Sequence, residues 1–256
     1  MKFVVIGGTG LIGSKVVSRL RDQGHEVVAA APSTGINILT GEGLDEAMKG
    51  ADTVIDLANS PSFEDEAVMD FFRTAGTHVL QAEAKAGVRH HLALSVVGTD
   101  KLLASGYFRA KNAQEQLIRD SGIPYTIVHS TQFFEFLPGI VASGTEGQTV
   151  RLPDALVQPI ASEDVGRAVA YLALKDPANG IVEIAGPQPE AMADLARRFM
   201  DVVQDPREVV SDANALYFGA ALQNETLVPA GKAWLGEINF ERWIAQSQYA
   251  PQAARA

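Results

Sequence analysis

The chain has 256 residues, of which 46% are hydrophobic and 20% charged, a composition that excludes a disordered or fibrous protein. Its formal net charge of −10 argues against nucleic acid or an anionic membrane surface as a partner, since both attract basic patches. Cysteine is absent, which excludes disulfides, thiolate-bound metals and cysteine nucleophiles. No apolar run reaches the ~18 residues of a membrane-spanning helix, and we expect a cytoplasmic protein.

Strands and helices are predicted to alternate along the first half of the chain. Residues 2–6 form a short apolar strand, residues 11–23 show the apolar spacing of a helix, and residues 25–31 form a second strand. Further helices are predicted over 43–49, 64–86 and 107–121, and further strands over 53–58, 90–96 and 124–129. This alternation predicts βαβ units, and hence an α/β fold with a Rossmann-type doubly wound parallel sheet.

The pattern changes after residue 130. Short strands are predicted at 149–153 and 157–161, a helix at 162–174, a strand at 181–186 and a helix at 189–203. No linker rich in Gly, Ser or Pro separates the two halves. We therefore expect a single compact domain over 1–256, with a core at 1–130 that the glycine motif described next marks as dinucleotide-binding. Residues 131–256 would complete the sheet and form a small substrate-side lobe, and a homodimer is possible.

Residues 7–13 read G-G-T-G-L-I-G and lie between the first predicted strand and the first predicted helix. Glycines at this turn permit a tight bend and a close approach of the backbone, and the helix N-terminus then faces a pyrophosphate with free N–H groups. The residues predicted to bind the dinucleotide are Gly7, Gly8, Thr9, Gly10, Leu11, Ile12 and Gly13. The alternative is a merely tight strand–helix turn, whereas a P-loop is excluded because no G-K-[ST] follows.

The end of the second predicted strand indicates which dinucleotide is bound. An Asp or Glu there would favour NAD, but the residues are Ala-Ala-Pro-Ser-Thr at 30–34. No carboxylate repels a 2′-phosphate, so NADP(H) is favoured over NAD(H), with Ser33 as a contact. The alternative is that Ser33 and Thr34 only form a turn. No metal is expected, because the adjacent His90 and His91 point to opposite faces of a strand.

Tyr107 and Lys111 stand four residues apart on a predicted helix and therefore share one face. A nearby ammonium group would lower the pKa of the phenol, which would make Tyr107 a usable proton donor to a carbonyl oxygen. Ser95 lies at the C-terminal end of a predicted strand, where open α/β sheets bind their ligands. The alternative is an exposed helix pair worth only a few tenths of a kcal/mol, since this spacing also arises by chance.

The segments GGTGLIG, AEAKAGVRHHLALSVVG, GYFRAK, SGIPYTIV and PIASEDVGRAV resemble the atypical short-chain dehydrogenase/reductase superfamily. The similarity covers roughly residues 1–190 and is closest to the NmrA-like NAD(P)H-binding branch. The resemblance implies that Ser95, Tyr107 and Lys111 carry the chemistry. It also implies that Ala58 and Asn59 approach the adenosine side of the cofactor.

Two positions depart from the pattern of that superfamily. Arg73 stands near the place of a helical Asn that completes the catalytic set in many members, and His129 stands where many atypical members have Arg. Some members of the branch bind the dinucleotide without turnover and act as redox sensors. The sequence therefore leaves that alternative open.

The function expected from these motifs is an NAD(P)H-dependent oxidoreductase that reduces a small-molecule carbonyl or quinone, with Tyr107 as proton donor. The alternatives are an NmrA-like redox-sensing NAD(P)-binding regulator without turnover, and a non-redox use such as epimerisation. The aromatic residues Phe133, Phe134 and Phe136 are predicted to bind substrate, with ordinary core packing of the lobe as an equal alternative.

Overall fold

The computed structural model describes residues 1–250 and shows two compact units. The first unit comprises residues 1–129 and 165–182, and the second comprises residues 130–164 and 183 onward. The first unit thus ends within one residue of the predicted boundary, but the segment 165–182 returns to it. Whether the two units form the single compact domain expected from the sequence stays a prediction.

A seven-stranded sheet has the order β12-β9-β5-β4-β3-β1-β2. Its strands are β1 (Lys2–Ile6), β2 (Glu26–Ala30), β3 (Thr53–Asp56), β4 (His90–Val96), β5 (Tyr125–Ser130), β9 (Gly180–Ala185) and β12 (Trp234–Leu235). β1 pairs in parallel with β2 on one side and β3 on the other, and β3 pairs in parallel with β4. The chain therefore reverses its direction of winding at β1, which confirms the predicted Rossmann-type α/β fold.

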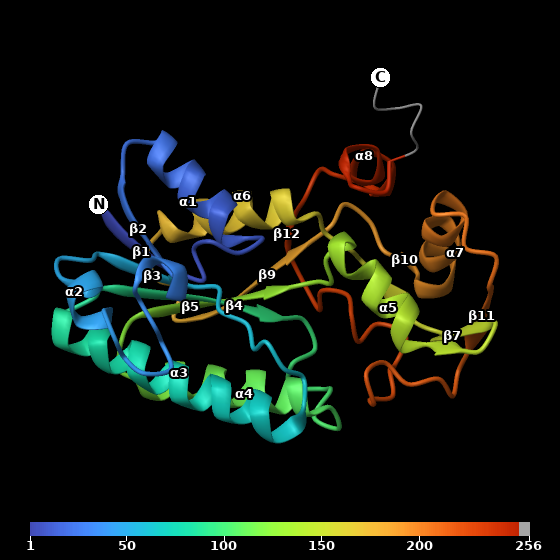
Figure 1. The fold of residues 1–256 in the computed structure, drawn as a ribbon, viewed down its shortest axis with the longest axis horizontal. Coiled ribbons are helices and arrows are strands. Elements are labelled where there is room, and N and C mark those ends of the chain that lie inside the picture. The colour runs from blue at the N-terminus through green and yellow to red at the C-terminus, as the bar shows by residue number, and fades with distance from the viewer. Residues whose placement is uncertain (251–256) are drawn as a thin grey trace. The chain divides into compact units, whose positions relative to one another are not determined.

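Helices cover both faces of this sheet in the first unit. The helices are α1 (Gly13–Asp22), α2 (Leu44–Met48), α3 (Asp65–Ala86), α4 (Gly106–Asp120) and α6 (Ser162–Ala173). Figure 1 shows α3 and α4 side by side on one face, with α1 and α6 on the other. The apolar side chains Val16, Val17 and Leu20 of α1 are buried, as the helical spacing predicts. Because β1 is covered on both faces, its Phe-Val-Val-Ile run is buried throughout.

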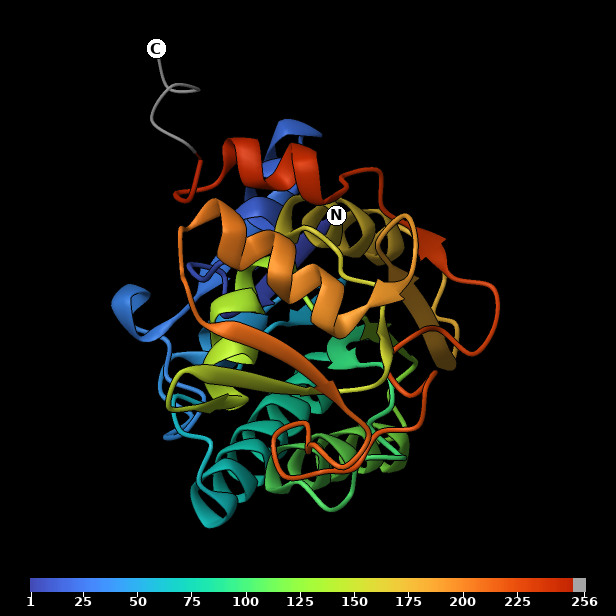
Figure 2. The same ribbon diagram turned by 90° about the vertical axis from the view of Figure 1, so that its right-hand side faces the viewer.

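Within the described residues, the second unit holds two small sheets and three α-helices. Its strands are β6 (Thr145–Glu146), β7 (Thr149–Pro153), β8 (Leu156–Val157), β10 (Glu190–Ala191) and β11 (Glu208–Asp212), and its helices are α5 (Leu137–Ser143), α7 (Met192–Val202) and α8 (Phe240–Gln246). β7 lies between β6 and β11, and α5 and α7 pack against it (Figure 2). β8 pairs with β10 in a separate antiparallel ladder.

The predicted strand over 157–161 is wrong. Only Leu156 and Val157 pair with β10, because Pro159 has no N–H to continue a ladder. Ile160 keeps an isolated bridge to Phe133. The predicted helix over 189–203 begins later, at Met192, since Glu190 and Ala191 form β10.

Candidate functional site

The glycine loop forms the tight turn that the sequence predicts. Gly7 has a φ of 71° and donates its N–H to the carbonyl oxygen of Ala30, at 2.9 Å. A Cβ added at Gly13 would lie 2.1 Å from the carbonyl oxygen of Gly7, and one at Gly8 would lie 2.8 Å from the Cα of Ala29. Glycine is therefore required at these positions by backbone geometry and close packing, independently of any ligand.

The same loop presents backbone donors. Within residues 1–250, the N–H groups of Thr9, Leu11 and Ile12 make no hydrogen bond. Thr9, Gly10 and Leu11 are exposed, whereas the side chain of Ile12 is buried, so Ile12 can reach a ligand only through its backbone. Free N–H groups at the start of α1, together with the positive end of its helix dipole, fit the pyrophosphate of a dinucleotide.

The segment after β2 carries no carboxylate. Thr34 serves the turn, because its Oγ1 donates to the carbonyl oxygen of Ala29 at 2.8 Å and accepts from the N–H of Ala31 at 3.0 Å. Ser33 is exposed, and its hydroxyl makes no hydrogen bond to any of the described residues. Of the two proposed adenosine contacts, Ala58 is half-buried and Asn59 is exposed.

Tyr107 and Lys111 lie one turn apart on α4, but among the described contacts no hydrogen bond joins their side chains. Tyr107 is half-buried against the rings of Phe63, Phe72 and Phe108. This burial raises the pKa of the phenol above its ordinary value. The expectation that Lys111 lowers the pKa of Tyr107 is therefore wrong for this structure, since the ammonium group is held elsewhere.

Lys111 is buried and fully engaged. Its Nζ donates to the carbonyl oxygen of Leu94, at 2.9 Å, and to Oε1 of Gln114, and it lies over the ring of Phe72. Gln114 in turn donates to Oδ2 of Asp56, at 2.9 Å. Burial lowers the pKa of Lys111 to about 8, although the negative charges of Asp56 and Glu115 oppose this shift.

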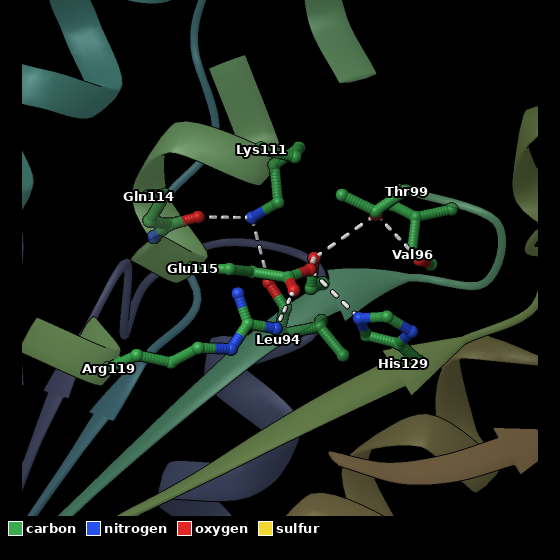
Figure 3. Close-up of polar contacts among 9 residues, drawn as sticks. Leu94, Val96, Thr99, Lys111, Gln114, Glu115, Arg119 and His129 are labelled. Atoms are coloured by element: carbon green, nitrogen blue, oxygen red, sulfur yellow. Dashed lines mark hydrogen bonds and ion pairs between the residues drawn. The ribbon is translucent and has the colours of Figure 1, made fainter. Parts of the chain in front are cut away.

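Ser95 belongs to a second polar group next to Lys111. Its Oγ donates to Oε1 of Glu115 at 2.6 Å, and His129 Nε2 lies 2.8 Å from the same oxygen. Arg119 donates to Oε2 of Glu115 at 2.7 Å. Figure 3 shows Lys111, Gln114 and Glu115 reaching from α4 toward β4, with His129 nearby. Burial opposes ionisation of Glu115, but hydrogen bonds from His129, Ser95 and Arg119 lower its pKa below the ordinary value.

Sequence reasoning missed Asp56, Gln114 and Glu115, although a signal for two of them exists. Lys111, Gln114, Glu115 and Ile118 follow the i, i+3, i+4, i+7 spacing of the buried face of α4. Three of these four positions are polar where a helix in an α/β fold ordinarily has apolar residues. Polar residues at core positions of a helix therefore indicated a buried network.

A further buried polar pair lies in the first unit, away from Tyr107. His91 Nδ1 contacts Oε1 of Glu83 at 2.8 Å, while Glu83 Oε2 and His91 Nε2 have no hydrogen-bond partner among residues 1–250. Burial raises the pKa of Glu83, and the negative charge of Glu83 raises the pKa of His91 against the effect of burial. No cluster of three or more His, Asp or Glu side chains suited to a metal occurs in residues 1–250.

The three predicted substrate contacts have different environments in the second unit. Phe134 is 2% exposed and stacks on Trp243, so it belongs to the core of this unit. Phe133 stacks on Phe136, which is 52% exposed. Phe136 is thus the member of the set whose ring is open to a ligand.

A family model described as NAD(P)H-binding matches residues 7–177, the range that contains the glycine loop, Ser95, Tyr107 and Lys111. The chain belongs to this NAD(P)H-binding family. A reductase of (4-alkanoyl-5-oxo-2,5-dihydrofuran-3-yl)methyl phosphate from Streptomyces griseus is 32% identical over 67% of this chain and 62% of its own length. The photosystem II assembly factor Ycf39 of Synechocystis is 26% identical over 54% of this chain and 47% of its own. The chain therefore spans less than two thirds of either relative.

Among solved structures, a short-chain dehydrogenase/reductase superfamily protein from Agrobacterium tumefaciens, with bound NAD, is similar in fold to this NAD(P)H-binding protein. The TM-score is 0.72 at 17% identity, and the match covers 100% of this chain and 97% of the other. The likeness confirms the fold of that superfamily, while membership of the NmrA-like branch stays a prediction. No helix within residues 1–250 has the length and apolar character to cross a membrane.

Proposed function

We propose that this protein is an NAD(P)H-dependent reductase of a small-molecule carbonyl or quinone. The observation that carries the proposal is that the first unit holds both the glycine loop and Tyr107, whose phenol makes no hydrogen bond to any of residues 1–250. The pKa of Tyr107 is raised, so the phenol keeps its proton at neutral pH. The named activity of the Streptomyces griseus relative supports reduction as the reaction type.

We assign each of these residues a role according to its position. The N–H groups of Thr9, Leu11 and Ile12 would hold the pyrophosphate of the dinucleotide, which would supply the hydride when bound. Tyr107 donates the proton to the substrate oxygen. Lys111 is buried against Leu94 and Gln114 near the end of β4, so its Nζ would have to leave these partners to contact the cofactor's ribose.

We further propose that the preferred cofactor is NADP(H). No carboxylate lies at 30–36 to repel a 2′-phosphate, and the hydroxyl of exposed Ser33 is available to it. Phe136, with Phe133 stacked against it, supplies an apolar surface for the substrate. The cytoplasmic location, the NmrA-like branch and a homodimer are parts of the same proposal that rest on sequence alone.

The second candidate function is a dinucleotide-binding regulatory protein without turnover. It is favoured by the position of Lys111, which does not acidify Tyr107, and by the similarity to an assembly factor. The two candidates differ in one observable. A reductase oxidises NADPH when a substrate is added, whereas a sensor binds NADPH and leaves it unchanged.

The test combines calorimetry with a turnover assay. Binding of NADPH and NADH is measured on the purified chain, and oxidation of NADPH is then followed with cyclohexanone, benzaldehyde and menadione. Binding with oxidation of at least one substrate is the expected result. Binding without oxidation of any compound in a wider panel of carbonyls and quinones would favour the regulatory protein.

A further inference from the structure

The hydroxyl of Ser95 has a single proton, and the structure shows where that proton goes. Ser95 Oγ donates to Glu115 at 2.6 Å. The carboxylate of Glu115 is ionised, since its pKa is lowered and Arg119 and His129 both donate to it. An ionised carboxylate accepts hydrogen bonds and has no proton to return. Ser95 therefore cannot donate to a second group while Glu115 holds its proton.

The hydroxyl proton of Thr99 is likewise already donated. Its Oγ1 donates to the carbonyl oxygen of Val96 at 2.6 Å and lies 3.5 Å from Ser95 Oγ. Because each proton is directed to an acceptor 2.6 Å away, the 3.5 Å contact between the two hydroxyls is at most a weak, shared hydrogen bond. The two oxygens nevertheless keep lone pairs, and the side chains of Ser95 and Thr99 are 3% and 1% exposed. Buried lone pairs of this kind favour a hydrogen-bond donor over a carbonyl oxygen.

We propose that Glu115 fixes Ser95 as a hydrogen-bond acceptor, and that Ser95 and Thr99 together bind a donor group of the ligand. The inference rests on the proposed reductase function and deepens it. The donor is a hydroxyl or a primary amide, carried either by the substrate or by the carboxamide of the cofactor. It replaces the role that the sequence gives Ser95, since the substrate oxygen then receives its proton from Tyr107 without help from Ser95.

Glu115 acts here as a positioning residue, and its amide counterpart is an informative variant. In Glu115→Gln, Arg119 retains the side-chain oxygen and turns the amide N–H toward Ser95. Ser95 then accepts from the amide, and its own proton is released toward the ligand. The substitution thus inverts the preference of Ser95 from donor groups to acceptor groups, with nearly unchanged side-chain volume.

Two pairs of probes separate the two sources of the donor. Benzamide and acetophenone differ by the exchange of an NH₂ for a CH₃ group, and so do NADP⁺ and its 3-acetylpyridine analogue. Affinities are measured by calorimetry, with NADP⁺ present for the first pair, so that no turnover occurs. The readout is the ratio of the affinity for the NH₂ compound to that for its CH₃ counterpart.

In Ser95→Ala and in Glu115→Gln we expect this ratio to fall by about tenfold or more for at least one pair, as the loss of one buried hydrogen bond implies. The matched control is Ser143→Ala, which removes a hydroxyl bonded to the carbonyl oxygen of Ile140 in the second unit. Its ratios are expected to equal those of the wild type. If Glu115→Gln does not fold, Thr99→Val is used in its place, because it removes the second acceptor oxygen.

Ratios that stay within about threefold of wild type for both pairs, in every folded variant, would overturn the proposal. A rise of the ratio in Ser95→Ala would overturn it as well, since it would show that Ser95 disfavours the NH₂ group in the wild type. The proposed function fails separately, if the wild-type chain oxidises NADPH with none of the carbonyls and quinones tested. In that event the two binding ratios still decide whether Ser95 is an acceptor.

Discussion

The ammonium group of Lys111 lies over the ring of Phe72, with Nζ 4.6 Å from the ring centre. Burial in this position lowers the pKa of Lys111 to about 8 from its ordinary value of 10.5. Between these two pH values Lys111 is therefore protonated in the unfolded chain and largely deprotonated in the folded chain. The free energy of unfolding accordingly rises with pH in this window, by about 1 kcal/mol per pH unit near pH 9.

Lys111→Met removes this group and provides the comparison. We measure the free energy of unfolding of both proteins by urea denaturation. The value for the wild type minus that for Lys111→Met is expected to increase from pH 8 to pH 9.5. A difference that is constant over this range would show that Lys111 titrates in the folded chain as it does in water.

Gly13→Ala tests the glycine loop. The new Cβ would collide with the carbonyl oxygen of Gly7, so the loop must open and its N–H groups move. We expect NADPH affinity to fall by about a hundredfold or more, as measured by calorimetry. Gly139→Ala, in α5, is the matched control, because no atom of residues 1–250 lies within 4 Å of its added Cβ. Equal losses in both variants would contradict the role given to the loop.

Ser33→Asp tests the cofactor preference. A carboxylate after β2 repels a 2′-phosphate and accepts hydrogen bonds from ribose hydroxyls. We expect the ratio of NADPH to NADH affinity to fall by about tenfold or more. Ser143→Asp introduces the same charge in the second unit and controls for net charge. An unchanged ratio in Ser33→Asp would place the 2′-phosphate away from this turn.

The buried pair Glu83–His91 predicts non-additive losses of stability. His91→Leu leaves Glu83 buried without its partner and should cost about 3–5 kcal/mol, whereas Glu83→Leu together with His91→Leu should restore at least half of that loss. Denaturation of the two single variants and the double variant closes a double-mutant cycle. Additive losses would mean that the contact at 2.8 Å contributes nothing to the energy.

The fold was largely predictable because its signals are local. The apolar run of β1, the glycines at 7–13 and the helical spacing of α1 all act within a few residues of each other. The site was predictable only in part. The links of Lys111 to Leu94 and of Glu115 to Ser95 join residues 17 and 20 positions apart, and only the packing of α4 on the sheet decides them.

The error over Tyr107 has the same origin. An i, i+4 spacing places two Cβ atoms on one helix face, but it does not decide where a flexible lysine directs its Nζ. Asp56 and Gln114, contributed by β3 and α4, draw Lys111 toward the sheet. Similarly, Phe134 could not be separated from Phe136 until the ring of Trp243 was seen to cover it.

The central claim is that Tyr107 gives the proton in a reduction by NADPH. The most direct measurement is the rate of NADPH oxidation, with the best substrate of the carbonyl and quinone panel, in wild type and in Tyr107→Phe. Tyr171→Phe, which changes an exposed tyrosine on α6, serves as the control. We expect Tyr107→Phe to lower kcat by about a hundredfold or more while Tyr171→Phe matches the wild type. Equal rates in Tyr107→Phe and wild type would contradict the account.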